Sequence, residues 1–252
     1  LGEDNATVAH DLRAVKPERV TDYELGADWR RGAASLAVNL YAMEFRDEIA
    51  LAGELSDIGL PLRRNVDRSF RRGVEIDGRW RPAPELDLRL TANLSRNRIA
   101  AWTQFYDAYD AAGVFVGQES RVHRDVEPLL TPDVIVNPSI TWQARPWLDI
   151  AALGRYVGRS WLDNTNAAGF TTPSFFQLDL ALGAELARWL AFGHPRLRVQ
   201  VNNVLDNRRI WPSGYDYIYV QQDGAGGASL AGTPSYYPQA SRSFFVALEL
   251  KR

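Results

Sequence analysis

The chain has 252 residues, a formal net charge of -2 and no cysteine. A charge so close to zero gives no broad attraction to nucleic acid or to anionic lipid, and the lack of cysteine excludes disulfide frameworks, thiolate zinc sites and thiol catalysis. No apolar run approaches the about 18 residues of a membrane helix. Composition therefore leaves open one or two soluble domains or a membrane barrel, whose strands need only about 9–11 residues each.

The start of the chain is polar, and residues 1–17 are predicted to form a loop. Residues 1–5 lack the basic start and the apolar centre of a signal peptide. We therefore expect the chain to begin after a processing site or inside a longer protein.

From Glu18 onwards, apolar and polar residues alternate with a period of two, which is typical of strands that have one apolar and one polar face. In the clearest segment, residues 86–95, four leucines and an alanine share one face, and polar residues share the other. In the least clear segment, residues 35–47, two interleaved sets of apolar side chains compete for the apolar face: Leu36, Val38 and Leu40 against Tyr41, Met43 and Phe45. Nine strands are predicted, around residues 18–30, 35–47, 74–80, 86–95, 134–143, 148–156, 176–185, 197–206 and 243–251.

The connections between these strands alternate in length along the chain, with short reversals between longer segments. An antiparallel up-and-down sheet with all its long loops at one edge is what an outer-membrane barrel requires. In such a barrel the short turns face the periplasm, which places the C-terminus there. Tryptophans lie at or beside the short reversals, where an interfacial girdle would sit: Trp29, Trp80, Trp142 and Trp147. A soluble sandwich that folds its apolar faces inward is the alternative.

Two segments near the end of the chain resemble TonB-dependent outer-membrane receptors. Residues 201–207, Val-Asn-Asn-Val-Leu-Asp-Asn, are similar to the penultimate strand of that family, and residues 236–250 are similar to its last strand. Ser241-Arg242 stands where Gly-Arg is usual. Three further segments are of family type: residues 15–26, which contain Lys-Pro-Glu, 72–75 and 155–158.

The resemblance implies a fold for the whole protein. Members have a 22-stranded barrel with an N-terminal plug in the lumen, and residues 1–252 would be the C-terminal portion of that barrel domain, without the plug. The expected fold class is therefore all-β, an antiparallel up-and-down transmembrane β-barrel that is partial, with about nine strands, long extracellular loops and short periplasmic turns. Both edges of such a sheet would be bare. Arg252 stands where the family usually has an aromatic residue, so the chain is either trimmed or carries a weaker insertion signal.

The resemblance also implies a function, active transport of a scarce nutrient such as siderophore-iron or a similar chelate across the outer membrane of a Gram-negative cell. The expected partners are outer-membrane lipid, a small-molecule ligand such as a metal chelate, and the energising inner-membrane complex, reached through the plug; no nucleic acid and no cofactor are expected. Two other functions remain open, a passive outer-membrane pore and a soluble all-β carbohydrate-binding module.

Two aromatic clusters in expected loops are the candidate ligand contacts, because rings bury area at low entropic cost. One follows the strand at residues 86–95: Trp102, Phe105, Tyr106 and Tyr109. The other precedes the last strand: Trp211, Tyr215, Tyr217 and Tyr219. Three arginines could attract an anionic ligand: Arg121, Arg124 and Arg208. The alternative is that these rings only pack the loops together.

No catalytic constellation is present in the sequence, and we do not expect an enzyme. His10, His123 and His194 are scattered, without a partner at a recognisable spacing, and no metal site is predicted. The charged residues of the polar faces are expected to pair with one another or with a plug: Glu75, Asp77, Arg79, Asp87, Arg89 and Arg155.

Overall fold

The computed structural model describes residues 16–55, 61–187, 189 and 194–251. Most of the loop expected at residues 1–17, with His10, lies outside these residues, as does Arg252. No stretch of the described residues forms a helix of the length and apolarity that crossing a membrane requires. The described residues form fourteen strands: β1 (Arg19–Arg31), β2 (Ala34–Leu55), β3 (Pro61–Ala83), β4 (Leu86–Tyr109), β5 (Phe115–Val126), β6 (Val134–Arg145), β7 (Leu148–Val157), β8 (Ser160–Trp161), β9 (Thr171–Thr172), β10 (Phe175–Glu185), β11 (His194–Asn202), β12 (Ser213–Gln222), β13 (Ala228–Tyr237) and β14 (Ser243–Lys251).

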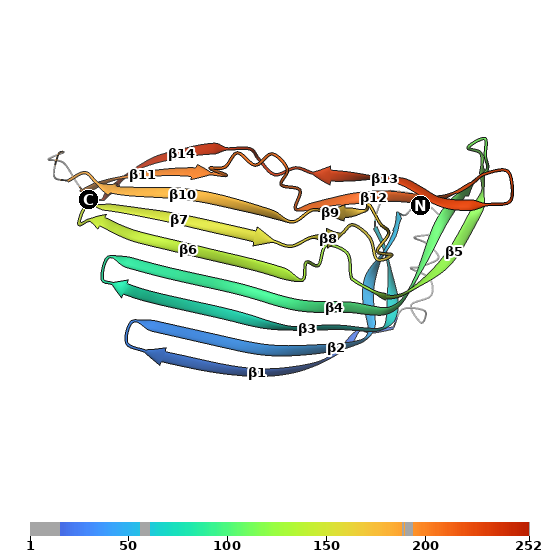
Figure 1. Ribbon diagram of the computed structural model, residues 1–252, viewed down its shortest axis with the longest axis horizontal. Helices are drawn as coiled ribbons and strands as arrows, with labels where there is room; N and C mark the ends of the chain where they lie inside the picture. Colours follow the sequence, from blue (N-terminus) through green and yellow to red (C-terminus); the bar gives the residue numbers. More distant parts are fainter. Residues whose placement is uncertain (1–15, 56–60, 188, 190–193, 252) are drawn as a thin grey trace.

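Nine of these strands form one continuous antiparallel sheet, which we call the wall, in the order β1-β2-β3-β4-β6-β7-β10-β11-β14 (Figure 1). They are the nine strands predicted from the alternation, so the all-β, up-and-down fold is confirmed. The short connections all lie at one end of the wall, on the left of Figure 1, and the long ones at the other. We call these the short-turn end and the long-hairpin end.

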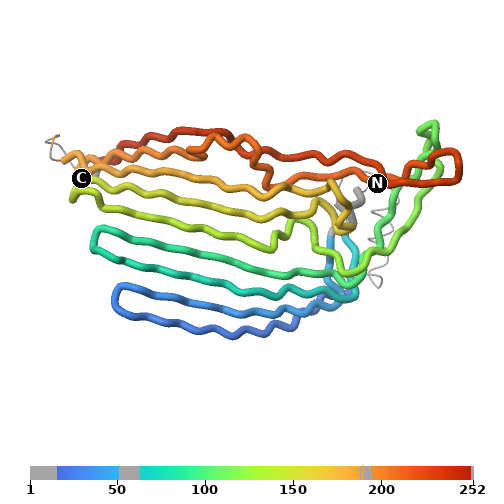
Figure 2. Tube along the Cα trace, viewed as in Figure 1, coloured from blue at the N-terminus to red at the C-terminus, as the bar shows by residue number. Residues whose placement is uncertain are grey.

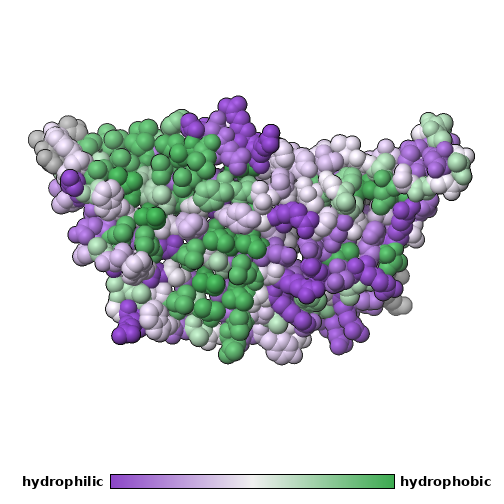
Figure 3. All heavy atoms as spheres, in the orientation of Figure 1, coloured by the Kyte–Doolittle hydropathy of each residue, from purple (hydrophilic) through white to green (hydrophobic). Residues whose placement is uncertain are grey.

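One face of the wall is apolar across all nine strands. The register aligns apolar residues in rows, because directly paired residues point to the same side; one row joins Leu25, Leu40, Val74, Leu94 and Val134 on five successive strands. We call the apolar band on this face the apolar belt, and Figure 3 shows the apolar side chains that are gathered in it.

The belt decides between the two competing sets in β2. Leu36, Val38 and Leu40 lie on the apolar face, whereas Tyr41, Met43 and Phe45 lie on the opposite face. Along β4 the belt runs from Leu86 to Leu94, nine residues, which matches the about 9–11 residues of a membrane-spanning strand.

The long segments expected to be loops are largely strands. β2 and β3 continue past the belt as a hairpin, β4 runs on to Tyr109 and pairs with β5, and β12 pairs with β13. The candidate residues of the first cluster therefore lie within β4, not in a loop. The expected reversal at residues 81–84 is also shorter than predicted, because β3 extends to Ala83 through an irregular register that accommodates Pro82.

The polar face of the wall is tied together by side chains that cross several strands. Arg79, Arg81 and Arg89 all bond to Asp87, so part of the expected pairing of polar-face charges is present. Tyr41 lies over Gly73, where a Cβ would meet the Tyr41 hydroxyl at 2.6 Å, and accepts a 3.3 Å hydrogen bond from Asn93. A glycine beside a large ring in this way lets one side chain bridge three strands.

The two C-terminal segments that resemble the receptor family are joined by hydrogen bonds, which we call the clasp. Asn203 is 1% exposed and has a left-handed backbone, φ 51°. Its amide Nδ2 donates to the carbonyl oxygens of Asn207, at 3.0 Å, and Ala240, at 3.3 Å. Asp206 accepts from the backbone N–H of Arg242 at 3.1 Å. The clasp thus fixes the two ends of the segment that carries β12 and β13.

The Lys-Pro-Glu segment also has a structural role. Lys16 pairs with Asp47 at 3.2 Å, and the Glu18 carboxylate accepts the backbone N–H of Ile49 at 2.8 Å. These contacts hold the start of β1 against β2.

Candidate ligand-binding site

Three segments that are far apart in the sequence converge at the long-hairpin end of the wall (Figure 2). The β4–β5 hairpin leans across to the β12–β13 hairpin, and the two meet as a short parallel pair, Ala108 with Val220 and Tyr109 with Gln221. The segment around β8 and β9 packs beneath them: the Tyr236 hydroxyl donates to the Thr171 carbonyl at 3.1 Å. The two predicted aromatic clusters therefore share one end of the molecule.

Three tyrosines of the two clusters lie together with two neighbouring residues in a partly exposed group, the tyrosine patch: Tyr109, Tyr217 and Tyr219 with Phe115 and Asp107. The hydroxyls of Tyr109 and Tyr217 are 2.8 Å apart, and Tyr217 donates to Asp107 at 3.1 Å. Tyr109 makes edge contacts with Phe115 and Tyr219, with ring centroids 5.9 and 5.3 Å apart. Hydrogen bonding to Tyr109, helped by burial and by Asp107, raises the pKa of Tyr217.

Below the tyrosine patch, polar groups from all three segments are buried together. The Tyr106 hydroxyl lies 2.9 Å from His123 Nε2, and Asp163 accepts from the hydroxyl and the backbone N–H of Thr165. Burial raises the pKa of Tyr106 to about 12 and lowers the pKa of His123. Burial also raises the pKa of Asp163. The pKa of Asp216 is raised to about 7, mainly by burial and in addition by the nearby Asp163 carboxylate.

The remaining candidate residues are placed differently. Trp102 and Tyr106 are 3% and 1% exposed and pack the hairpins, which is the alternative role considered for these rings. Phe105 lies under Arg64, 4.4 Å from guanidinium to ring centroid. Trp211 stacks on Tyr236 at 4.7 Å, and Tyr215, which is 55% exposed, lies beside Tyr237.

The three candidate arginines also differ in their surroundings. Arg121 pairs with Glu119 at 3.2 Å and lies over the Tyr106 ring, and Arg208 pairs with Asp206 at 3.2 Å. Arg124 is exposed on β5. Asp107 and Phe115 were not among the predicted ligand contacts; their position beside aromatic residues on the same hairpin was the signal that could have added them.

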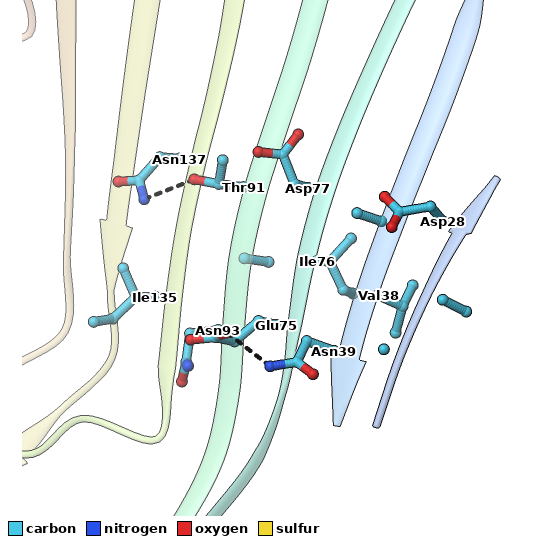
Figure 4. Close-up of a pocket in the computed structure, with 14 residues that line it drawn as sticks. Asp28, Val38, Asn39, Glu75, Ile76, Asp77, Thr91, Asn93, Ile135 and Asn137 are labelled. Atoms are coloured by element: carbon cyan, nitrogen blue, oxygen red, sulfur yellow. Dashed lines mark hydrogen bonds between the residues drawn. The ribbon is translucent and has the colours of Figure 1, made fainter. Parts of the chain in front are cut away.

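The polar face of the wall is hollowed into a groove of about 520 Å³ between β1 and β6 (Figure 4). Carboxylates and amides line it, and two hydrogen bonds cross it, from Asn39 to Glu75 at 3.5 Å and from Asn137 to Thr91 at 3.2 Å. Asp28 and Asp77 also line it. A second hollow of about 420 Å³ continues the groove towards the long-hairpin end and is covered in part by residues 130–132.

The groups brought together here are suited to binding. In the described ranges, no three His, Asp or Glu side chains are grouped so that they could hold a metal ion. What the long-hairpin end offers is exposed rings with hydroxyl and carboxylate groups at their edges, an arrangement suited to an amphipathic ligand.

Comparison with protein families decides what kind of protein carries this wall. The model of the TonB-dependent receptor-like β-barrel matches residues 2–204, most of the chain. The chain belongs to the TonB-dependent receptor family. The resemblance in the sequence is thereby confirmed, and the family is one of outer-membrane barrels. A search of curated proteins finds no match to this chain.

Solved structures of TonB-dependent receptors share the fold. The ferric yersiniabactin uptake receptor FyuA from Yersinia pestis is 17% identical, with a TM-score of 0.61 over 91% of this chain and 29% of its own. The siderophore receptor PiuA from Acinetobacter baumannii is 14% identical, with a TM-score of 0.63 over 91% of this chain and 28% of its own. The copper transporter OprC is 14% identical, with a TM-score of 0.63 over 96% of this chain and 32% of its own. The chain thus spans about three tenths of the length of these proteins.

Proposed function

We propose that this chain is the C-terminal part of the barrel wall of an outer-membrane uptake receptor for a scarce nutrient. The observation that carries the proposal is the apolar belt, which is continuous over nine strands and backed by a polar face with a groove. The leucine side chains of the belt are largely exposed; for example, Leu25 is 70% and Leu248 is 56% exposed. A soluble carbohydrate-binding sandwich would bury this face, so its exposure favours lipid as the neighbour.

In this arrangement the belt contacts lipid and the polar face lines the lumen, opposite a plug that engages the energising inner-membrane complex. The short-turn end lies in the periplasm with the C-terminus, and the long-hairpin end lies outside the cell. Tryptophans support this placement, because Trp29, Trp80 and Trp142 are about half exposed at the short-turn edge of the belt. No observation favours a passive pore over an active receptor.

The orientation is testable because the chain has no native cysteine. Ala225→Cys lies between β12 and β13, and Glu85→Cys lies in the turn between β3 and β4; both positions are exposed. With a membrane-impermeant maleimide, intact cells should label Ala225→Cys, and Glu85→Cys should be labelled only after the outer membrane is permeabilised. Labelling of Glu85→Cys alone in intact cells would reverse the orientation. Equal labelling of both in intact cells would remove the membrane placement.

For the ligand, we propose a metal chelate such as a siderophore complex, bound at the tyrosine patch and the neighbouring Tyr215. The relatives of known structure include receptors for ferric chelates and a copper transporter. Exposed rings with hydroxyls aligned by Asp107 suit a ligand that is apolar on one side and rich in oxygen on the other.

The ligand proposal is tested at one hydroxyl. Tyr217→Phe keeps the ring but removes the hydroxyl that bonds to Tyr109 and Asp107. It should weaken the binding of a ferric tris-catecholate probe by about threefold to tenfold. Tyr23→Phe, on β1 and 63% exposed, is the control and should leave affinity unchanged. Unchanged affinity in Tyr217→Phe, measured by equilibrium dialysis, would place the chelate elsewhere.

A further inference from the structure

A cationic surface lies on the same face of the wall as the apolar belt, directly beyond the edge of the belt that is nearer to the long-hairpin end. Arg72 follows the belt residue Val74 two positions along β3, and Arg96 follows Leu94 two positions along β4, so both point to the belt side. Figure 3 shows a strongly hydrophilic area next to the apolar belt over this part of β1 to β4. Five arginines on these four strands make up the arginine patch: Arg19, Arg46, Arg68, Arg72 and Arg96.

The register of the wall places these arginines directly against one another. Arg19 pairs with Arg46 across β1 and β2, and Arg46 pairs with Arg68 across β2 and β3. Arg72 pairs with Arg96 across β3 and β4. Like charges directly opposite in an antiparallel ladder are destabilising, so three such pairs on one surface favour the binding of anions.

The protein itself neutralises only part of this charge. Arg72 pairs with Glu44 at 2.5 Å and lies over the Phe70 ring at 4.4 Å. In the described part of the chain the other four, which are all exposed, have no ion-pair partner: Arg19, Arg46, Arg68 and Arg96. The contrast is Arg98, farther along β4, which pairs with Glu127 at 3.2 Å.

We propose that the arginine patch binds the phosphate groups of phosphomonoester-bearing lipids in the leaflet that meets the long-hairpin end. The patch adjoins the apolar belt, so a lipid whose chains lie on the belt brings its headgroup to the arginines. A phosphomonoester carries a charge of about -1.5 to -2 and accepts paired hydrogen bonds from the planar guanidinium. The aliphatic part of each arginine can lie along apolar surface while the charged end reaches the headgroup. This inference rests on the membrane placement proposed above.

The test measures lipid binding to the protein in detergent micelles by native mass spectrometry, with phosphatidic acid as the probe and phosphatidylcholine as the neutral comparison. The protein should bind phosphatidic acid at least about tenfold more tightly than phosphatidylcholine. The triple variant Arg46→Gln/Arg68→Gln/Arg96→Gln should lose this preference. Its control is Arg81→Gln/Arg89→Gln/Arg155→Gln, which removes three exposed charges from the polar face and should keep the preference.

Each contrary result is informative. Equal affinity for the two lipids, or an unchanged preference in the triple variant, would overturn the proposal. Inorganic phosphate that displaces the lipid at equal concentration would make the patch a general anion site and would also overturn it. If the triple variant fails to fold, the unaltered protein decides: its preference must decline between about 50 and about 500 mM salt, and a constant preference refutes the proposal. Insertion into phosphatidylcholine bilayers without any lipid preference would leave the proposed membrane placement intact, whereas failure to insert would remove that placement first.

Discussion

The wall and the long-hairpin end of this molecule are held together in different ways. In the wall, neighbouring strands form long antiparallel ladders with few register irregularities, and each position is defined by which of two faces it points to. At the long-hairpin end, contacts join residues about a hundred positions apart, such as Tyr109 with Tyr217 and Asp110 with Gln221, through individual hydrogen bonds. At most positions of the wall the polarity of the residue is therefore the main constraint, whereas the long-hairpin end depends on specific side chains.

The largest effect is expected where polarity alone is broken. Leu90→Arg places a charge in the middle of the apolar belt and should lower the free energy of unfolding in lipid vesicles by about 2–4 kcal/mol. Thr91→Arg is the matched control, because the next residue of β4 lines the groove on the polar face and should tolerate a charge with little loss. Equal losses in urea titrations of both variants would mean that the two faces do not meet different solvents.

The second effect concerns specific side chains at the base of the long-hairpin end. Asn203→Ala leaves the carbonyls of Asn207 and Ala240 without the buried amide that donates to them, and it puts alanine into a left-handed conformation. The free energy of unfolding should decline by about 2–3 kcal/mol. Asn202→Ala, one residue earlier and more exposed, should cost much less. A similar loss in both variants would show that the clasp contributes no more than an ordinary strand end.

A smaller effect tests whether the wall also contains positions that polarity does not describe. A Cβ at Gly73 would meet the Tyr41 hydroxyl and the Leu94 carbonyl oxygen, each at 2.6 Å. Gly73→Ala should therefore cost about 1–2 kcal/mol. Gly26→Ala, on the same face of β1, meets no atom closer than 3.6 Å and should be neutral. Thermal unfolding of both variants measures the difference, and a neutral Gly73→Ala would mean that Tyr41 moves aside freely.

The smallest effect is a pH dependence confined to the long-hairpin end. The folded pKa of Asp216, raised to about 7 by burial and by Asp163, lies above the ordinary aspartate value. A carboxyl group whose pKa is higher in the folded protein than in the unfolded chain makes its full contribution to stability at pH values below its unfolded pKa. That contribution is lost as the pH rises through the pKa of the folded protein. Stability should thus decline between about pH 4 and pH 7.

Asp216→Asn should flatten this decline and raise stability at pH 8 by about 1 kcal/mol or less, because the group is only half-buried and solvent screens it. The control is Asp110→Asn. The Asp110 carboxylate lies at the same end of the molecule and accepts hydrogen bonds from the backbone N–H groups of Ala112 and Val114. Melting temperatures recorded from pH 4 to pH 8 give the comparison. An unaltered slope in Asp216→Asn would assign the pH dependence to another group.

The same contrast explains how much could be predicted from the sequence. The nine strands of the wall were predictable because each has one face that meets an apolar neighbour, which imposes a period of two. β5, β12 and β13 were not, because their residues do not separate into one apolar and one polar face. In β12, tyrosines share one face, whereas the other face carries both Asp216 and the buried Val220. β4 shows the limit within one strand: Asn97 and Ile99 are buried, but beyond the exposed Ala100 and Ala101 the even-numbered Trp102 and Tyr106 are buried instead. The change of face coincides with the left-handed backbone of Asp125 on the paired strand β5. The sequence of β4 contains no pattern that predicts this change.

For the candidate site, the sequence identified the residue types but not their roles. It grouped Tyr109 with Trp102 because they are close in the chain, whereas in the structure Trp102 packs with Val66, Ile99 and Val126, and Tyr109 bonds to Tyr217. Contacts between hairpins depend on how far each one leans, and that is set by pairs such as Ala108 with Val220 rather than by local propensity. Burial of a ring could therefore not be distinguished from ligand contact before the hairpins were placed.

The clasp separates the evolution of the wall from that of the segment it encloses. Asn203 and Asp206 hold one end of residues 208–239, and Ala240 and Arg242 hold the other, so both ends remain in place whatever lies between them. An insertion, a deletion or a whole exchanged hairpin between these points leaves β11 and β14 in register. Residues 208–239 are therefore the natural segment to exchange when a hairpin from another member of the family is grafted onto this wall.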